Sequence, residues 1–189
     1  MFDWFSKDSD DAVSLLKRDH DTVKELFDEF EKAKQRPAKK KIVAKALTEL
    51  KVHAALEEEI FYPAVRTELE HDVMNEADEE HHVAKVLIAE LEKMTGKEDH
   101  YDAKFTVLSE NVRHHIKEEE GEMLPKAKRL PIDFDALGAR MLERKEELLT
   151  NGVPAVEEDR VADPKADSPA RAAVKKKRAI KRKSSVTGR

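Results

Sequence analysis

The stretch His53-Ala-Ala-Leu-Glu57-Glu-Glu-Ile-Phe-Tyr-Pro63 has a second copy later in the chain, His115-Ile-Lys-Glu-Glu119-Glu-Gly-Glu-Met-Leu-Pro125. Both copies read H-x3-E-E-x4-P. The segments upstream of the two copies also align, His20-Asp-Thr-Val-Lys24 with His81-His-Val-Ala-Lys85. The histidines of each half are 33 and 34 residues apart. A repeat of this kind indicates two similar structural halves that face each other.

The residues around the repeat predict an all-α protein. Apolar residues recur every three or four positions, which is the period of one helix face, while Gly (5) and Pro (7) are sparse. We expect five helices, with Ser9 or Asp10 capping the first and Pro63 kinking or ending the second. Their approximate ranges are 11–34, 38–66, 72–94, 99–128 and 133–150.

Short connections between these helices force neighbours to run antiparallel, which predicts an up-down-up-down four-helix bundle. The shorter fifth helix is expected to pack on the end or side of the bundle, and the sequence leaves open whether it covers the bundle or mediates dimerisation. We therefore divide the chain into a bundle over residues 1–130, an accessory helix over 131–150 and a tail over 151–189.

The C-terminal tail differs in composition from the rest of the chain. Residues 164–189 contain ten Lys or Arg and one acidic residue, whereas the preceding residues contain 26 Lys or Arg and 40 acidic residues. Such a segment cannot bury a core, so we expect a disordered basic tail. One interpretation is non-specific contact with nucleic acid or another polyanion, since no aromatic residue is interleaved for base stacking.

Composition also excludes several classes of protein. The chain has no Cys, which excludes disulfides, thiolate zinc sites and Fe–S clusters. The longest apolar run, Val86 to Ala89, is too short to cross a membrane, and the N-terminus lacks the pattern of a signal peptide. We expect a soluble cytoplasmic protein, of undetermined oligomeric state.

Polar residues interrupt each of the first four apolar stripes at one point. In the first stripe, the spacing that turns Leu16 and Val23 inward also turns His20 inward. The inward polar residues are His20, His53, Glu57, His81, His115 and Glu119. Buried carboxylates and imidazoles without partners are costly, so a cation is expected among them.

The residue types and spacing favour a dinuclear metal site. His and Glu four residues apart share one helix face and can hold the same metal. Four imidazoles and two carboxylates suit iron, and zinc or manganese less naturally. Six ligands exceed the needs of one four-coordinate zinc but give three to each of two metals if the carboxylates bridge. Positions then stay open for solvent, a bridging oxygen or an added ligand.

In these residues the chain resembles the hemerythrin-like HHE cation-binding domain, over roughly residues 11–128. The resemblance includes the flanking segments Leu16–Phe27 and Glu58–Pro63. It implies a four-helix bundle around two iron ions (Fe2+/Fe3+) joined by an oxo or hydroxo bridge. Glu57 and Glu119 would be the bridging carboxylates and the four histidines the terminal ligands.

The chain departs from the oxygen-carrying members of that family at two positions. They have an additional histidine where this chain has Ala77, and usually an Asp five residues after the last histidine where this chain has Glu119, four after His115. The emptier coordination sphere favours reaction with peroxide or nitric oxide, or sensing, over reversible oxygen carriage.

The resulting hypothesis is a non-haem di-iron protein that binds oxygen, peroxide or nitric oxide as a sensor or detoxifier. A di-iron enzyme with catalase-like or oxidase turnover is one alternative. The other is a bundle that stores or senses iron and acts on nucleic acid through its basic tail. The residues predict no catalytic side chain beyond the ligands.

The remaining histidines are expected at the surface. His82 and His114 share faces with charged residues and with Asn111, although either could replace its inward neighbour as a ligand. His71 and His100 lie in or near the predicted loops.

Other polar neighbours of the ligands are interpreted as structural. Glu58 and Glu120 are expected on solvated faces rather than bound to an imidazole, and Lys24 and Lys85 as exposed charges. Tyr62 is expected to pack in the core rather than to act as a redox-active neighbour.

Overall fold

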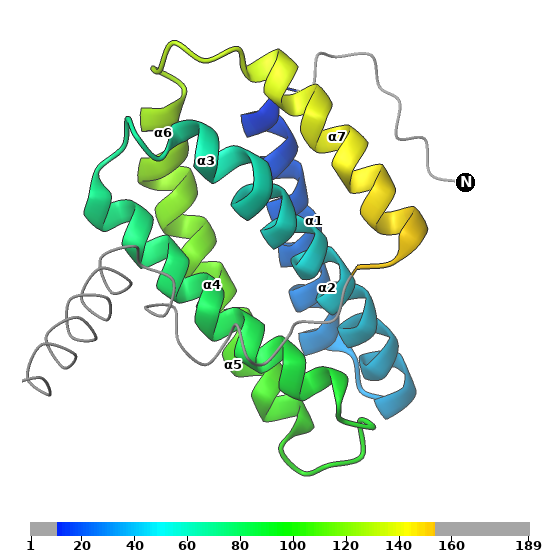
Figure 1. Ribbon diagram of the computed structural model, residues 1–189. Coiled ribbons are helices and arrows are strands. Elements are labelled where there is room, and N and C mark those ends of the chain that lie inside the picture. Colours follow the sequence, from blue (N-terminus) through cyan, green and yellow to red (C-terminus); the bar gives the residue numbers. More distant parts are fainter. Residues whose placement is uncertain (1–10, 154–189) are drawn as a thin grey trace, which may run out of the picture. The chain divides into compact units, whose positions relative to one another are not determined.

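The computed structural model describes residues 11–153, so the predictions for residues 1–10 and for the tail from residue 154 onward lie outside the described residues. The described chain is helical throughout (Figure 1), which confirms the all-α prediction. Its elements are α1 (Ala12–Lys32), α2 (Arg36–Leu56), η1 (Glu57–Phe61), α3 (Tyr62–Val65), α4 (His71–Glu92), α5 (Tyr101–Glu118), η2 (Glu119–Met123), α6 (Leu124–Ala127) and α7 (Phe134–Asn151).

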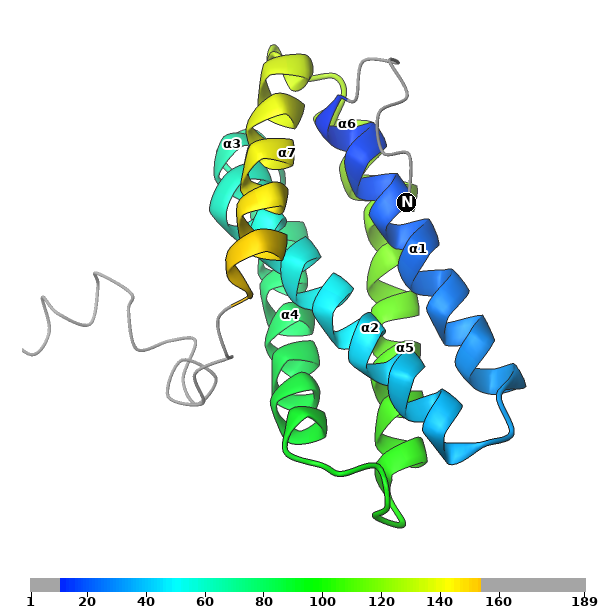
Figure 2. The ribbon, with the colours of Figure 1, turned by 90° about the vertical axis from the view of Figure 1, so that its right-hand side faces the viewer.

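The four long helices α1, α2, α4 and α5 form the predicted up-down-up-down bundle. Helix α1 packs against α2 and α4 packs against α5, while contacts between α2 and α4 and between α1 and α5 close the ring. Figures 1 and 2 show the four helices side by side from two directions. Because the connections are short, each helix runs antiparallel beside the preceding one.

The core of the bundle is divided along its length into two apolar clusters. One cluster, which includes Leu16 and Phe61, lies toward α3, α6 and the start of α7. The other, which includes Phe27 and Phe105, lies toward the α1–α2 and α4–α5 connections. Each buried side chain of this size contributes roughly 1.5–3 kcal/mol. His20 therefore points inward at a level of the bundle that lies between the two clusters.

The first helix is capped by a different residue from those predicted. Asp11, rather than Ser9 or Asp10, accepts hydrogen bonds through Oδ1 from the Val13 and Ser14 N–H groups at 2.9 and 3.0 Å. The Ser14 hydroxyl donates to Oδ2 at 2.9 Å. Ser, Asp and Asn are all favoured at N-caps, so residue type alone does not choose among the three positions.

Two π-helical turns, η1 and η2, interrupt the helices that the sequence predicted as regular. In η1 the Tyr62 N–H donates to the carbonyl of Glu57, five residues back, and η2 repeats this pattern from Glu119. Pro63 and Pro125 follow directly and have no N–H to donate. In a regular helix a proline ring clashes with the carbonyl four residues earlier, and a wider turn relieves that clash. The predicted kink at Pro63 is therefore a π turn in a continuing helix.

The fifth helix, α7, packs against α1, α2 and η1 and so covers one side of the bundle. Asp133 caps it by accepting from the Ala136 N–H at 2.9 Å, and Leu137, Met141 and Leu148 are buried. Within residues 11–153, no helix combines the length and the apolar character that crossing a membrane requires.

Candidate metal centre

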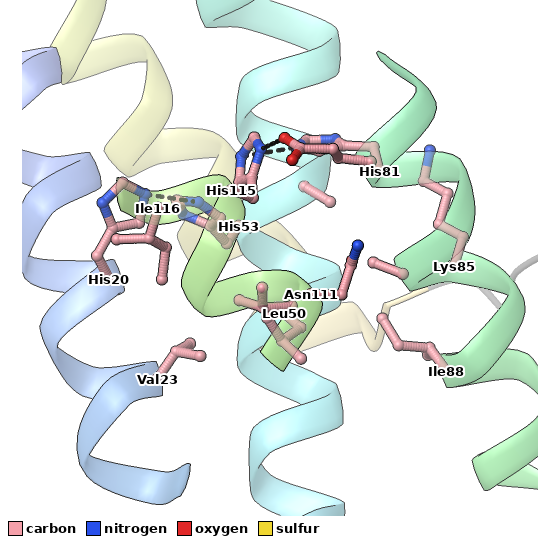
Figure 3. A pocket seen from close by; sticks show the side chains of 14 residues that line it. His20, Val23, Leu50, His53, His81, Lys85, Ile88, Asn111, His115 and Ile116 are labelled. Atoms are coloured by element: carbon pink, nitrogen blue, oxygen red, sulfur yellow. Dashed lines mark hydrogen bonds and ion pairs between the residues drawn. The ribbon is translucent and has the colours of Figure 1, made fainter. Parts of the chain in front are cut away.

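The structure brings all six predicted ligand residues together between the two apolar clusters. The two glutamates occupy the first position of η1 and η2, and each histidine comes from one of the four long helices. Figure 3 shows the four histidines above a shared pocket. The exposed fractions lie between 0% and 7% for His20, His53, Glu57, His81, His115 and Glu119.

Glu57 connects two groups of inward-facing atoms. Its Oε1 lies 3.2 Å from Nε2 of His53, and its Oε2 lies 3.1 Å from Nε2 of His81. His20 belongs to the first group, because its Nε2 lies 3.1 Å from Nε2 of His53 and 3.0 Å from Oε2 of Glu119.

The second group is completed by His115, whose Nε2 lies 3.3 Å from Nε2 of His81. The ligand atoms therefore form two clusters, each with two histidines, and Glu57 belongs to both. Glu119 reaches only the first cluster in the described geometry. The arrangement matches two metal positions that share the carboxylate of Glu57.

These separations fit a metal better than they fit hydrogen bonds. Two ligand atoms about 2.1 Å from one metal, at right angles to each other, are about 3.0 Å apart. Both oxygens of Glu57 and of Glu119 are buried and lack a hydrogen-bond donor among the described residues. Burying carboxylates in this state is costly. A shared cation at each cluster would remove that cost, so the residues present fit a dinuclear metal centre.

Carboxylates also bind the outward nitrogen of the imidazoles. His20 Nδ1 donates to Glu120 Oε1 at 2.9 Å and His81 Nδ1 donates to Glu58 Oε1 at 2.8 Å. The expectation that Glu58 and Glu120 lie only on solvated faces is therefore wrong. Each stands one residue after an inward glutamate, so its long side chain reaches sideways to the neighbouring helix.

A second pair of carboxylates serves the other two histidines. His115 Nδ1 donates to Glu80 Oε2 at 2.8 Å, and Oδ2 of Asp19 lies 3.8 Å from His53 Nδ1. Asp19 and Glu80 directly precede the inward histidines of α1 and α4, so the repeat extends to these carboxylates as well. Such partners orient each ring with Nε2 toward the metal and raise its basicity.

Two lysines complete the symmetric arrangement. Lys24 Nζ lies 3.4 Å from Glu120 Oε1, and Lys85 Nζ pairs with Glu58 Oε2. The expectation that both are merely exposed charges is wrong, since each supports a carboxylate that holds a histidine. The two pairs also join the halves, because each lysine comes from one half of the repeat and its glutamate from the other.

Without metal, the centre favours positive charge on His53 and His81. Burial lowers the pKa of His81, but the adjacent carboxylates of Glu57 and Glu58 outweigh burial and raise that pKa to about 9. The same competition, with Glu57 dominant among the charges, raises the pKa of His53 well above its usual value. Burial raises the pKa of Glu119, and the charge of Glu57 raises it further. Metal binding must displace such protons, so metal affinity rises with pH.

Tyr62 touches the centre in addition to packing in the core. Its Oη lies 3.3 Å from Nε2 of His81 and its side chain is 1% exposed. Burial, with the charges of Glu57 and Glu119, raises the pKa of Tyr62 well above its usual value, so the phenol keeps its proton. The equivalent position in the second half is Leu124, which has no polar group.

Lys145 was missed by the sequence analysis, as were Asp19 and Glu80. The Lys145 ammonium, from α7, pairs with Oδ1 of Asp19, and the two side chains are both 6% exposed. A signal for it existed, because Lys145 falls on the three-to-four spacing of Met141 and Leu148. A charged residue at an inward position predicts a buried partner of opposite charge.

The other histidines do not join the centre. His114 is 57% exposed, His71 and His100 are exposed and His82 is half-buried, while their inward neighbours face the cluster. Asn111 differs from its predicted place on a solvated face. It is half-buried, it lines the pocket below the histidines, and its Oδ1 is buried without a donor among the described residues.

A small cavity adjoins the four imidazoles (Figure 3). The volume that a small molecule can occupy in this cavity is about 40 Å³. Apart from the histidines its walls are mostly aliphatic, and Asn111, Glu80 and Lys85 are its polar contributors. The aliphatic lining residues are Val23, Leu50, Ala54, Ala84, Ile88, Val112 and Ile116.

Comparison with known proteins agrees with this fold. Residues 11–127 match the family described as the hemerythrin HHE cation binding domain. The crystal structure of a hemerythrin HHE cation binding domain-containing protein from Mycobacterium kansasii is similar to this one, with a TM-score of 0.63. The two chains share 23% sequence identity over 77% of this chain and 96% of that chain. The search of curated proteins found no match.

Proposed function

The chain belongs to the hemerythrin HHE cation-binding family, and from that premise we propose that it is a di-iron protein that binds oxygen, hydrogen peroxide or nitric oxide. It would act as a sensor or detoxifier of that ligand. The observation that carries the proposal is the cavity of about 40 Å³ that opens directly onto all four inward imidazoles.

The donor set supports iron. Four imidazoles and two carboxylates divide into two clusters that share Glu57, and mixed nitrogen and oxygen ligands of this kind suit first-row metals such as iron. Two histidines and one or two carboxylate oxygens do not complete six-fold coordination at either position. When bound, iron would supply Lewis acidity and redox equivalents to a ligand at the open positions.

The cavity supports a small ligand. A water molecule needs roughly 10–15 Å³ of such space, so the cavity admits a diatomic molecule or peroxide but no larger substrate. Aliphatic walls such as Val23, Ile88 and Val112 exclude bulk water and favour an apolar gas. Asn111 is the uncharged polar side chain in this lining and can hydrogen-bond the ligand.

A peroxide-decomposing enzyme is the second candidate, and Tyr62 is the observation that favours it. Its phenol holds a proton at Oη, 3.3 Å from Nε2 of His81, where a proton donor would assist cleavage of an O–O bond. Release of oxygen from peroxide by the iron-loaded protein, above the rate of free iron, would support turnover. No release above that rate would leave the binding proposal and reject the enzyme.

Metal analysis tests the main proposal. Protein from iron-supplemented expression is expected to carry two irons per chain by mass spectrometry and to absorb in the near-ultraviolet. Peroxide and nitric oxide, added separately, are expected to change that spectrum. His53→Ala and Glu119→Ala should each remove most of the iron, whereas the control His82→Ala should retain it. Iron far below two per chain, or a spectrum that neither ligand changes, would contradict the proposal.

A further inference from the structure

A second group of metal-ligating side chains lies outside the centre. Glu80 from α4 and His114 and Glu118 from α5 place their ligand atoms within 4.8 Å of one another. Nε2 of His114 lies 3.2 Å from Oε1 of Glu118 and 3.6 Å from Oε1 of Glu80. His114 and Glu118 are 57% and 43% exposed, while Glu80 is 13% exposed.

Glu80 links this group to the buried centre. Its Oε2 accepts from Nδ1 of His115, an inward histidine, and its Oε1 faces His114. The pair His114 and Glu118 also copies the spacing of His115 and Glu119, one residue earlier on the same helix. Two His-x3-Glu pairs therefore lie side by side on α5, one facing the centre and one facing solvent.

The carboxylate of Glu80 and its equivalent in the first half of the repeat have different charged partners. The equivalent of Glu80 is Asp19, whose charge is balanced by the buried ammonium of Lys145. Within residues 11–153, no Lys or Arg forms an ion pair with Glu80. Among the described residues, the ammonium that Lys145 places beside Asp19 thus has no equivalent beside Glu80.

The residues that flank the position also differ between the halves. The equivalents of His114 and Glu118 are Val52 and Leu56, which are 1% and 0% exposed. The first half is therefore closed by apolar packing. The second presents an imidazole and two carboxylates to solvent, where a cation can bind.

One pocket is lined both by two residues of this exposed group and by residues of the buried centre. It has space of about 80 Å³ and is lined by Glu80 and Glu118 as well as by buried His115 and Glu119. Glu119 is 1% exposed and its Oε1 has no hydrogen-bond donor among the described residues. Glu76 and Glu122 add two exposed carboxylates to the walls. A buried carboxylate without a hydrogen-bond donor thus lines the same pocket as Glu80 and Glu118.

We propose that Glu80, His114 and Glu118 form a third site, open to solvent, for a divalent first-row transition-metal cation, and that the acidic pocket carries the cation from there to the buried centre. The transit role rests on the proposed function. One imidazole favours such a cation over magnesium or calcium. Three protein ligands with open positions for water allow weak binding and release. Carboxylate walls concentrate cations near the pocket.

Manganese binding tests the third site in the full chain. After the buried centre is loaded with two equivalents of iron, Mn2+ is titrated and the free ion is measured by its electron paramagnetic resonance signal. The parent is expected to bind one further Mn2+ per chain. The double variant His114→Ala/Glu118→Gln should bind none in the same range. The matched control His82→Ala/Glu79→Gln changes one histidine and one glutamate on α4 and should behave like the parent.

Two results would overturn the third site: no further Mn2+ bound by the parent, or equal binding by the parent and the double variant. Both substituted side chains are exposed, so circular dichroism should show an unchanged helical fold. If the variant does lose helical signal, His114→Gln alone tests the site, with a weakened Mn2+ affinity expected and an unchanged affinity counting against it.

Iron uptake tests the route. Metal-free protein is mixed with Fe2+ without oxygen, and the free ion is followed with a coloured chelator. The double variant is expected to load about tenfold more slowly than the parent and to reach the same final iron content. Equal rates would reject the route. Failure of the proposed function would differ, because the parent itself would then not reach two irons per chain, while the difference in Mn2+ bound by the parent and by the double variant would still report the outer site.

Discussion

The two halves of the repeat contribute the same residue types to the candidate metal centre but differ in what covers them. Beside His53, α7 closes the outside of the bundle and Lys145 balances the charge of Asp19. Beside His115, the equivalent Glu80 faces an exposed imidazole and an acidic pocket. The repeated motif therefore specifies the ligands, whereas an element outside the repeat determines which half solvent can reach.

A second difference lies at the π turns. Tyr62 follows η1 and places its phenol 3.3 Å from His81, whereas Leu124 follows η2 and offers only an apolar side chain. Both differences place additional polar groups, the Tyr62 phenol and the exposed cluster around Glu80, beside His81 and His115. The comparison teaches that sequence symmetry in the candidate metal centre does not make its two halves equivalent.

The largest expected effect comes from removing what the halves share. Glu57→Gln leaves both clusters without their common carboxylate, so both metals should be lost. Because metal binds the folded state, chelation should lower the unfolding free energy of the parent by several kcal/mol. In Glu57→Gln the chelator should change little. Urea unfolding with and without chelator measures this, and the exposed Glu59→Gln is the control. Retention of one metal by Glu57→Gln would show that the halves bind independently.

Removing the buried ammonium of Lys145, which lies beside only one half, is expected to have the next largest effect. Lys145→Met leaves the charge of Asp19 buried without its ammonium, which should lower the unfolding free energy of the metal-free protein by about 3–5 kcal/mol. Asp19→Asn in the same chain should restore much of that loss. Urea unfolding of the single and double variants gives the coupling, and Lys117→Met, an exposed lysine on α5, serves as control. A loss below about 1 kcal/mol would contradict the assigned role of the pair.

Removing the phenol tests the difference at the π turns. Tyr62→Phe should lower stability by only about 0.5–1.5 kcal/mol, while the rate of reaction with peroxide falls several-fold and the iron content stays at two. Tyr101→Phe, which removes the other tyrosine hydroxyl at the far end of the bundle, is the matched control. If both variants react with peroxide at the parent rate, Tyr62 has only a packing role.

The smallest expected effect concerns the first helix of each half. Helix α1 has a side-chain cap in Asp11, while α4 has none from Glu70. Asp11→Ala should cost about 1 kcal/mol. Burial raises the pKa of Asp11, but the hydrogen bonds to Ser14 and Val13 and the nearby Lys128 hold it below its usual 3.8. The stabilisation is therefore complete above about pH 3.8 and is lost as the pH falls through the lower, folded-state pKa.

Thermal or urea unfolding between pH 2 and 7 checks the cap. The difference between the parent and Asp11→Ala should shrink toward low pH. Asp11→Asn should keep most of the cap at neutral pH, since Asn is an equally good capping residue, and should not show this dependence. A pH-independent difference for Asp11→Ala would assign the effect to packing instead.

Periodicity and the repeat were enough to predict the bundle and to bring the six inward residues to one level. They could not predict the contacts of Glu58 and Glu120, because a helical period sorts residues into inward and outward faces. A long side chain at the edge between these faces reaches the neighbouring helix, which the period does not describe. Asn111 is likewise half-buried rather than fully on either face, and it lines the pocket.

The π turns and Lys145 required different information. Pro63 signals a break in the helix, but only the packed structure shows that the break is taken up by a wide turn rather than by an end. Lys145 had the right spacing to point inward, yet its charge argued for the surface until Asp19 was seen as its partner. The ion pair between Lys145 of α7 and Asp19 of α1, which are far apart in the sequence, explains why Lys145 is buried.

The lining of the cavity below the histidines also affects how long the protein would survive its own chemistry. Among the described residues that form its walls, none is a methionine, tyrosine or tryptophan, and the chain has no cysteine. Thioethers and thiols are the side chains that peroxide damages most readily. A strong oxidant released into this cavity would meet mainly saturated carbon, whereas one released into the acidic pocket would meet Met123. The side of release would thus decide between repeated use and self-inactivation.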